Sequence, residues 1–294
     1  MSGLELGQTR PGFRSGFVSL VGRPNAGKST LLNQILGTKV AITSATPQTT
    51  RAQVRGVLQR PDAQVVFVDT PGLHRPRSAL GEHLNAAATD ALIGVDVVCV
   101  VVDATAPIGA GDQWVVDHAP RDAVTVMNKC DVASPDQIAQ QLVAAGAWDL
   151  AEYFPVSART GEGVDVLVDA LVARLPLGPA YYPPGTITDV SEAVQLAELV
   201  REQLLRRTRD ELPHSIHTRV TEWEWPRVRC EIVVERDSQK GMVIGKGGRL
   251  LKEVGIAVRR EFNEDMFLEL HVTVDRHWQR RPGAVERLLD PDAV

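Results

Sequence analysis

The sequence has few of the features that define several classes of protein. Its 294 residues include only three cysteines, Cys99, Cys130 and Cys230, which lie far apart and form no Cys-x-x-Cys pair. Neither a zinc site nor a disulfide framework is therefore favoured, and a reduced, cytosolic environment fits best. The longest unbroken apolar run, Val97–Val102, is far shorter than the roughly 20 residues that span a bilayer.

Two further absences narrow the class of protein to which the chain can belong. The N-terminal stretch lacks the apolar core of a signal peptide, so we expect residues 1–14 to form a disordered leader. The formal net charge is −5, so the chain as a whole is not a basic nucleic-acid binder. Any RNA site must therefore be a local patch of positive charge.

What is present begins with short valine-rich segments that alternate with helix-length segments. Strands alternating with helices imply a mostly parallel sheet, so residues 15–176 are predicted to form an α/β domain. Gln53–Leu58 is the exception and is predicted to be an antiparallel edge strand. The predicted buried strands are Gly16–Val21, Val65–Asp69, Val97–Asp103 and Ala123–Asn128, and the predicted helices include Ser29–Leu36, Pro135–Ala145 and Gly163–Leu175.

A stretch rich in proline and glycine, Leu175–Gly185, ends this pattern. Such a composition continues neither a helix nor a central strand, so residues 177–188 are predicted to be an extended, semi-rigid linker. Residues 189–294 then predict a second, α+β domain. Its elements are expected to be a helix at Ser191–Arg209, strands at Ser215–Glu224 and Arg227–Glu235, helices around Met242–Val243 and Leu250–Phe262, and a last strand at Phe267–Val274.

A phosphate-binding motif follows the first predicted strand. Residues Gly22–Thr30 read G-R-P-N-A-G-K-S-T and match G-x-x-x-x-G-K-[ST] between a strand and a helix. Its glycines allow backbone N–H groups to surround phosphate at the positive end of a helix dipole. Lys28 is expected to reach the β- and γ-phosphates, and Ser29 to bind Mg²⁺. The alternative is a glycine turn without a ligand.

The choice of base depends on the sequence N-K-C-D at Asn128–Asp131. The Asp131 carboxylate can accept hydrogen bonds from N1–H and the amine of guanine, whereas adenine would leave it buried and unpaired. Asn128 would steady the loop, and the stem of Lys129 would lie over the base. Val156-Ser157-Ala158 is expected to complete the pocket, with the Ala158 N–H donating to guanine O6.

Two segments are placed to sense the third phosphate. Asp69-Thr-Pro-Gly72 ends a buried strand, so Asp69 can hold Mg²⁺ through water and the Gly72 N–H can meet the γ-phosphate. Gln48-Thr-Thr-Arg51 lies in a loop long enough to move, and Thr50 is expected to bind Mg²⁺ only when the γ-phosphate is present. The alternative is that the threonines are turn residues.

The second domain carries a G-x-x-G loop, Gly245–Gly248, between two short helical segments. Residues 236–260 hold seven basic residues against Asp237 and Glu253, a local footprint typical of a phosphate site. A plain helix-to-helix turn is the alternative. We expect Trp223, Trp225 and Trp278 to pack in the core or at a domain interface, and His214 and His217 not to bind metal. The expected RNA-binding residues are Lys240, Gly245, Lys246, Gly247, Gly248, Arg249 and Lys252.

In order, these motifs resemble the TrmE–Era group of translation-factor-related GTPases. The helix–strand–strand–helix–GxxG–helix–strand order that follows resembles a type II KH domain, which within this group is typical of the Era family. The fold that the resemblance implies is a P-loop GTPase domain followed by an α+β KH domain. It implies catalytic roles for Lys28, Thr50 and Gly72, Mg²⁺ binding by Ser29, Thr50 and Asp69, and GTP or GDP binding by Gly22, Arg23, Pro24, Asn25, Ala26, Gly27, Lys28, Ser29, Thr30, Asp69, Thr70, Pro71, Gly72, Asn128, Lys129, Asp131, Ser157 and Ala158.

The resemblance also implies a role. Relatives hydrolyse GTP and bind small-subunit ribosomal RNA near its 3′ end, so this chain is expected to act on the 30S subunit as a monomeric, cytoplasmic checkpoint of ribosome assembly. Peripheral attachment to the inner face of the cell membrane stays open. Leu73 replaces the glutamine that orients water in Ras-type enzymes, so slow hydrolysis is expected. Asn25 matches an asparagine that helps relatives bind a monovalent cation, which suggests K⁺.

Two other functions are considered. The first is a GTP-dependent partner in tRNA modification, which lacks support because no domain for base chemistry and no C-terminal cysteine motif is present. The second is a constitutive RNA-binding module whose nucleotide is structural, and Leu73 keeps it open.

Overall fold

The computed structural model describes residues 11–44, 49–51, 53–73, 76, 78–209 and 212–289. The chain divides into two compact units. Unit 1 comprises residues 1–41, 50–75 and 84–189, and unit 2 comprises residues 42–49, 76–83 and 190–294. Among the described residues, no helix is long and apolar enough to cross a membrane.

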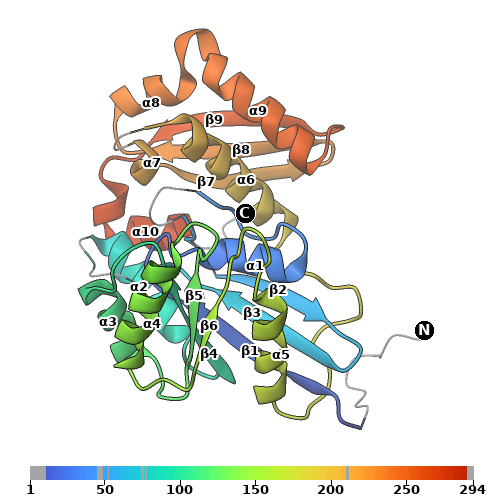
Figure 1. Ribbon diagram of the computed structural model, residues 1–294. Coiled ribbons are helices and arrows are strands. Elements are labelled where there is room, and N and C mark those ends of the chain that lie inside the picture. The colour runs from blue at the N-terminus through green and yellow to red at the C-terminus, as the bar shows by residue number, and fades with distance from the viewer. Residues whose placement is uncertain are drawn as a thin grey trace. The chain divides into compact units, whose positions relative to one another are not determined.

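Unit 1 is built on a six-stranded sheet in the order β2-β3-β1-β4-β5-β6 (Figure 1). Only β2 pairs antiparallel with its neighbour, as expected of an edge strand. The valine-rich strands are buried because parallel strands are covered on both faces. The strands are β1 (Arg14–Val21), β2 (Val54–Gln59), β3 (Ala63–Asp69), β4 (Val97–Asp103), β5 (Val124–Asn128) and β6 (Glu152–Pro155).

Helices cover both faces of this sheet. On one face, α3 (Ala110–His118) and α4 (Pro135–Gly146) share a core with Val98, Val100 and Val102 of β4. On the other face, α1 (Lys28–Leu36) packs against α5 (Val164–Arg174). Helix α2 (Ala79–Asp90) begins in unit 2 and ends in unit 1. The alternation of side chains along β4 explains why a continuous valine run can serve two cores.

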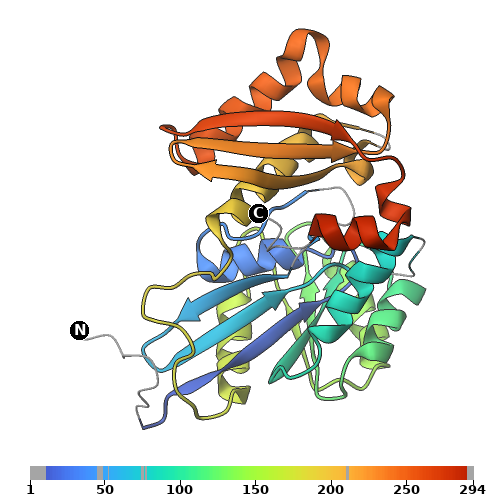
Figure 2. The ribbon, with the colours of Figure 1, turned by 180° about the vertical axis from the view of Figure 1, so that it is seen from behind.

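The predicted linker is bound along unit 1 (Figure 2). The buried Gln64 side chain binds the linker through both its amide oxygen and its amide nitrogen. Its Oε1 accepts from the Tyr181 and Tyr182 N–H groups at 2.7 and 3.0 Å. Its Nε2 donates to the Tyr182 carbonyl at 2.9 Å. The Val57 N–H donates to the Ile187 carbonyl at 2.7 Å. The proline-rich stretch thus extends the edge of the sheet as an ordered strap.

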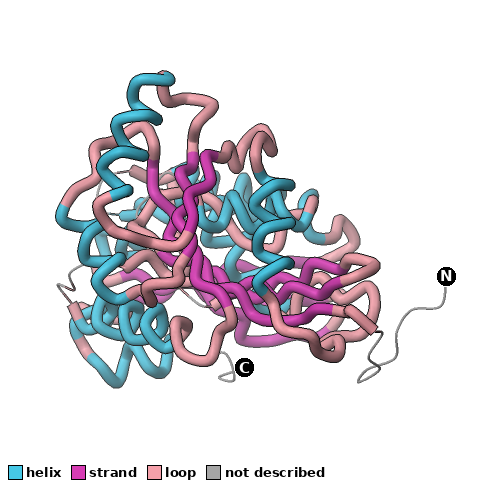
Figure 3. Tube along the Cα trace, turned by 60° about the horizontal axis from the view of Figure 1, so that its bottom comes forward, coloured by secondary structure: helices cyan, strands magenta, loops and turns pink. Residues whose placement is uncertain are grey.

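Unit 2 contains a three-stranded sheet in the order β7-β8-β9 (Figure 1), with β7 and β8 antiparallel and β8 and β9 parallel. Figure 3 draws the strands of both units in magenta. Its core joins the sheet to the apolar faces of α6 and α9. Ser191 caps α6, its Oγ accepting from the Val194 N–H at 3.4 Å. The elements are α6 (Glu192–Arg207), α7 (Leu212–Ser215), β7 (His217–Glu224), β8 (Arg227–Val234), α8 (Asp237–Ile244), η1 (Lys246–Gly248), α9 (Arg249–Phe262), β9 (Phe267–Val274), η2 (Trp278–Arg280) and α10 (Pro282–Leu289).

The predicted strands and helices are all present, with differences at the ends. Residues 1–10 of the predicted leader lie outside the described residues, but β1 begins at Arg14 and Phe13 is buried. The leader was therefore predicted too long, because the apolar Phe13 adds to the core and its carbonyl accepts from the Gly178 N–H at 3.2 Å. Strand β6 and helices α2, α3, α7 and α10 were not among the predicted elements.

The tryptophans of unit 2 separate into two kinds. Trp278 is fully buried and its Nε1 donates to the Ser215 carbonyl at 3.0 Å, and Trp223 packs against the core beside Phe262. Trp225, by contrast, is 51% exposed at the β7–β8 turn. Of the predicted core or domain-interface roles, the core role is confirmed for the first two tryptophans, whereas Trp225 is not in the core because a two-residue turn leaves no layer to cover it.

Candidate functional site

The glycine-rich loop between β1 and α1 is shaped by close contacts. Gly27, the residue before α1, has a φ of 95°, and a side chain there would meet Asn128 Nδ2 at 2.2 Å. Asn25 also lies in the left-handed region, with a φ of 65°. Glycine is therefore required at position 27 by both conformation and space. The turn leaves the first N–H groups of α1 facing outward, which is the arrangement that binds anions.

Lys28 is folded over this loop. Its Nζ donates to the carbonyls of Gly22 and Arg23, each at 3.1 Å. Burial lowers the pKa of Lys28 to about 8, and the nearby Asp69 carboxylate opposes this shift only in part. The ammonium is thus held in an environment where a phosphate would stabilise its charge.

Three side chains that carry oxygen atoms meet beside Lys28. Ser29 Oγ donates to Asp69 Oδ2 at 2.6 Å and lies 3.0 Å from Thr50 Oγ1, which donates to the same Asp69 oxygen at 3.3 Å. Burial raises the pKa of Asp69 although Lys28 and these hydroxyls lower it. Its Oδ1 is buried without a hydrogen-bond partner among the described residues. Two hydroxyls and a carboxylate with a spare oxygen fit a hard cation such as Mg²⁺.

The end of β5 brings the second set of motif residues to the same loop. Asn128 is buried, and its Nδ2 donates to the Ala26 carbonyl while its Oδ1 accepts from the Ala158 N–H, both at 2.9 Å. The Ala158 N–H, expected to face guanine O6, is therefore bonded to Asn128 in this structure. One amide thus holds the phosphate loop and the Val156–Ala158 loop together.

The neighbouring charged residues are also paired. Asp131 accepts from Ser157 Oγ at 2.7 Å and pairs with Arg159 at 2.6 Å, and the Ser157 hydrogen bond chiefly holds the pKa of Asp131 below its ordinary value. Lys129, with a φ of 68°, pairs with Asp103 at 2.5 Å. Burial opposes ionisation of Asp103, but hydrogen bonds from Lys129 and Thr105 leave its pKa lowered. Asp131 is thus kept ionised, as an acceptor of two N–H bonds must be.

The segment after β3 lies against the phosphate loop. A side chain on Gly72 would meet the Pro24 backbone nitrogen at 2.6 Å, and the Leu73 N–H donates to the Gly22 carbonyl at 3.2 Å. The Leu73 side chain is fully buried in the core of unit 1. Leucine at this position is therefore a packing residue of the core of unit 1.

Some predicted ligands have structural partners instead. The Thr70 hydroxyl donates to the Leu20 carbonyl at 2.9 Å, and Arg23 pairs with Asp112 of α3 at 2.8 Å. Sequence reasoning missed Asp103, Asp112 and Arg159, all partners of predicted site residues. Only Asp103 carried a signal, because it ends a buried strand at the same sheet edge as Asn128.

The G-x-x-G loop of unit 2 joins α8 to α9. Lys246 and Gly247 are exposed, and Gly245, Gly247 and Gly248 have φ values of 71°, 60° and 76°. A side chain on Gly245 would meet Leu250 Cβ at 3.0 Å, so this glycine is needed for the turn. The basic side chains beside the loop are solvent-accessible, although Arg249 pairs with Glu253 at 2.8 Å.

Most apolar side chains near this loop belong to the core of unit 2. Val254 and Val258 are fully buried in the core of unit 2, and Ile244 is packed partly against it. Ile256 is half-buried and Met242 is exposed. The loop therefore presents mainly backbone and positive charge.

Fold and site together define a P-loop GTPase domain followed by a KH domain. A family model described as "50S ribosome-binding GTPase" matches residues 17–129, and one described as "KH domain" matches residues 211–279. The chain is 49% identical to the GTPase Era of Mycobacterium avium, over 94% of this chain and 98% of that protein. It is 47% identical to GTPase Era of Mycobacterium tuberculosis, with the same coverage.

Solved structures agree with these relatives. A crystal structure of Era in complex with MgGDPNP and nucleotides 1506–1542 of 16S ribosomal RNA matches with a TM-score of 0.88 and 34% identity, over 95% of this chain and 99% of that one. A structure of Aquifex aeolicus Era Y63A bound to GDP·AlF4⁻ matches equally well. The chain belongs to the Era family of GTPases, and it binds and hydrolyses GTP.

Proposed function

We propose that this chain is a ribosome assembly checkpoint that binds small-subunit ribosomal RNA of the 30S subunit through its KH domain and couples that binding to GTP hydrolysis. The observation that carries the RNA part is the exposed, positively charged G-x-x-G loop, together with the similarity to an Era that was crystallised with 16S ribosomal RNA. We assign the residues from Phe13 to Pro176 to the GTPase domain, 177–188 to the linker and 189–294 to the KH domain.

In the proposed site, each residue acts through the contacts described above. Lys28 and the N–H groups of the glycine-rich loop bind phosphate oxygens, and Asp131 accepts from guanine. Ser29, Thr50 and Asp69 would hold Mg²⁺, which when bound neutralises charge on the phosphates. Because Leu73 is buried, the attacking water is oriented by backbone groups, with the Gly72 N–H against the γ-phosphate. This arrangement accounts for a slow intrinsic rate.

A monovalent cation is a further part of this proposal. Asn25 stands on the exposed outer turn of the phosphate loop, where its side-chain oxygen can reach a K⁺ beside the phosphates. Because its φ is 65°, Asn25→Ala would add backbone strain, and Asn25→Gly is the cleaner variant. Hydrolysis by Asn25→Gly should lose its stimulation by K⁺ over Na⁺, and a retained stimulation would contradict the role.

The decisive test of RNA binding uses a charge reversal with a matched neutral control. Lys246→Asp with Gly247→Asp puts two carboxylates against the RNA backbone, and Asp tolerates the left-handed conformation at position 247. Lys246→Asn with Gly247→Asn has the same shape and backbone demand without the charge. Affinity for a 16S ribosomal RNA 3′-end fragment is measured against salt concentration for all three proteins.

The reversal should lower affinity by orders of magnitude and flatten the salt dependence, since each lost phosphate contact removes a slope of about 0.7 for single strands. The neutral control should lose about one contact only. GTP affinity should be unchanged in both. An equal salt slope in wild type and reversal would place the RNA site elsewhere. Wild-type hydrolysis that is indifferent to RNA would instead favour a constitutive RNA-binding module.

The proposal extends to the location of the chain in the cell and to its oligomeric state. We assign the chain to the cytoplasm as a monomer, with peripheral attachment at the inner membrane face as an additional state. Co-sedimentation of the purified chain with 30S subunits and with anionic vesicles distinguishes the two locations. Sedimentation equilibrium of the chain alone measures its oligomeric state.

A further inference from the structure

The segment between α1 and β2 divides its contacts between the two units. Residues 42–49 group with unit 2, whereas Thr50, the next residue, groups with unit 1. Residues 45–48 lie outside the described residues. The described residues on either side show how this segment is held. Thr43 and Thr49 are both bound by charged side chains of α6.

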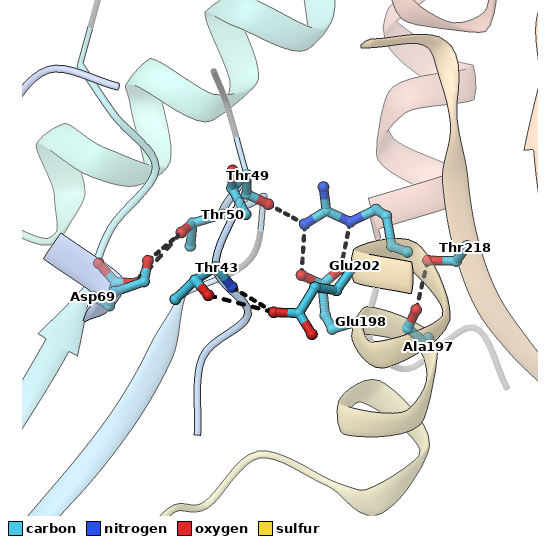
Figure 4. Close-up of polar contacts among 10 residues, drawn as sticks. Thr43, Thr49, Thr50, Asp69, Ala197, Glu198, Glu202 and Thr218 are labelled. Atoms are coloured by element: carbon cyan, nitrogen blue, oxygen red, sulfur yellow. Dashed lines mark hydrogen bonds and ion pairs between the residues drawn. The ribbon is translucent and has the colours of Figure 1, made fainter. Parts of the chain in front are cut away.

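Near its start, the segment is bound by Glu202. This side chain is fully buried, and its Oε1 accepts from the Thr43 N–H at 2.9 Å (Figure 4). The Thr43 hydroxyl lies 3.5 Å from the same oxygen, and Arg206 pairs with it at 3.0 Å. A buried carboxylate is costly unless it is paired, so this arrangement resists displacement of Thr43.

At its end, the segment is bound by Arg201, of which 1% of the side chain is exposed. Its Nη2 donates to the Thr49 carbonyl and to Glu198 Oε2, the latter at 2.6 Å, and its Nε donates to Glu198 Oε1 at 2.9 Å. Packing alone would be served as well by an apolar side chain, because a buried ion pair is seldom more stable than a hydrophobic replacement. The buried guanidinium is thus better explained by the carbonyl that it holds.

The Thr49 carbonyl belongs to the peptide group that joins Thr49 to Thr50, a residue of the candidate magnesium site. Because the peptide is planar, fixing the Thr49 oxygen also fixes the direction of the Thr50 nitrogen. The Thr50 hydroxyl lies 3.0 Å from Ser29 Oγ and 3.3 Å from Asp69 Oδ2 (Figure 4). The position of Thr50 is therefore set partly by α6.

Helix α6 is also bound to the elements that carry the G-x-x-G loop. The Thr218 hydroxyl of β7 donates to the Ala197 carbonyl at 2.8 Å, and Gln203 donates to Glu261 of α9 at 3.3 Å. Helix α9 begins directly after the loop, at Arg249. The G-x-x-G loop is thus connected to Thr49 along helix α9, across the Gln203–Glu261 hydrogen bond to α6, and through the Arg201 side chain.

We propose that Glu198, Arg201 and Glu202 form an α6 clamp whose function is to position Thr50 for the triphosphate state. Loss of the clamp releases Thr50, and displacement of Thr50 disturbs the clamp, so the nucleotide and the KH domain report on each other through α6. The inference rests on the proposed Mg²⁺ role of Thr50. Reciprocity requires that RNA favours the GTP state by the same factor by which GTP favours RNA.

The test is Arg201→Met, which keeps most of the volume and removes the donors. Its control is Gln195→Met on the same helix, because the Gln195 amide donates to the Val190 carbonyl at 2.7 Å and takes no part in the clamp or in the hydrogen bond between Gln203 and Glu261. Affinities for a Mg²⁺-bound non-hydrolysable GTP analogue and for Mg²⁺-bound GDP are measured by titration calorimetry. The Mg²⁺ concentration that gives half-maximal hydrolysis is measured alongside.

Arg201→Met should weaken the GTP analogue by about 5- to 150-fold, the usual range of such couplings, and raise the Mg²⁺ requirement. GDP affinity should stay within about twofold, since Thr50 is engaged only in the triphosphate state. Arg201→Lys, which retains one donor for the Thr49 carbonyl, should recover part of the loss. The preference of the RNA fragment for the GTP-bound over the GDP-bound protein should fall in parallel, and Gln195→Met should match wild type throughout.

Equal weakening of both nucleotides, or no change in either, would overturn the clamp, because a structural role does not distinguish them. If Arg201→Met does not fold, Glu198→Gln removes the charge that orients Arg201 and must show the same discrimination between nucleotides in a smaller degree. Failure of the proposed function would look different: wild type itself would then show no Mg²⁺-dependent preference for GTP.

Discussion

The Asn128 amide is buried and makes two hydrogen bonds to separate loops of the nucleotide site, which allows a quantitative test. The orientation of the amide is fixed by its partners, because the Ala26 carbonyl only accepts and the Ala158 N–H only donates. Asn128→Asp keeps the shape but places an oxygen against the Ala26 carbonyl at the position of Nδ2. An ionised carboxylate there is buried and faces a second oxygen, whereas a protonated one restores the missing donor.

The magnitude follows from the resulting pKa. Burial of this kind raises a carboxyl pKa by several units, and a rise of about 3 from 3.9 brings it to about 7. Each unit corresponds to about 1.36 kcal/mol, so the variant should lose about 4 kcal/mol of unfolding free energy at pH 8. At pH 5, only the roughly 1.1 pH units between the unfolded-state pKa of about 3.9 and the pH of the measurement contribute, so the loss of unfolding free energy should be about 1.5 kcal/mol. A raised folded-state pKa means that stability is retained at low pH and lost as the pH rises.

The assay is urea unfolding of the full chain at pH 5 and pH 8, followed by hydrogen exchange of peptides from β4 and β5 so that unit 1 is observed separately. With a slope of about 2 kcal/mol per molar urea, the midpoint relative to wild type should fall by about 1 M more at pH 8 than at pH 5. Asn128→Ala is the control, since it loses both hydrogen bonds but does not titrate. Equal losses at the two pH values in Asn128→Asp would refute the hydrogen-bonding role assigned to the amide.

Three other substitutions and conditions test the same site. Because the pKa of Lys28 is about 8 in the folded chain and 10.5 ordinarily, GTP affinity should fall as the pH rises from 8 to 9 and binding should take up a proton, measured by calorimetry in buffers of different ionisation enthalpy; proton release would contradict the burial of Lys28. By the same linkage, the unfolding free energy of the free protein should rise between pH 8 and about 10.5. Asp131→Asn should lose two hydrogen bonds of about 1.5 kcal/mol or more each to GTP, roughly 100-fold in affinity, and should prefer xanthosine triphosphate; an unchanged preference would remove Asp131 from the base pocket. Leu73→Ala should cost about 2–5 kcal/mol of stability from its buried position while leaving the single-turnover rate per folded molecule within a few-fold, and a large loss of rate would show that the side chain acts in the chemistry.

The sequence by itself determined the elements and the motifs, because both depend on local chemistry. A valine run such as β4 has few alternatives to a buried strand, and Ser191 with the apolar spacing after it specifies the start of α6. The glycine-rich loop before Lys28 was recognisable for the same reason: its glycines are required by local conformation, which neighbouring residues in the sequence dictate.

Only the tertiary structure decided which distant groups share one site. No pattern in the sequence indicates that the Asn128 amide would bond to Ala26 and Ala158, that Gln64 would hold the linker, or that Arg201 would bind the Thr49 carbonyl. Exposure was equally hidden, since Val254 and Trp225 are both apolar but the first is in the core and the second faces solvent. Such pairings depend on how the sheet order and helix packing bring separate segments together, and burial then makes each unpaired polar group costly enough to fix its partner.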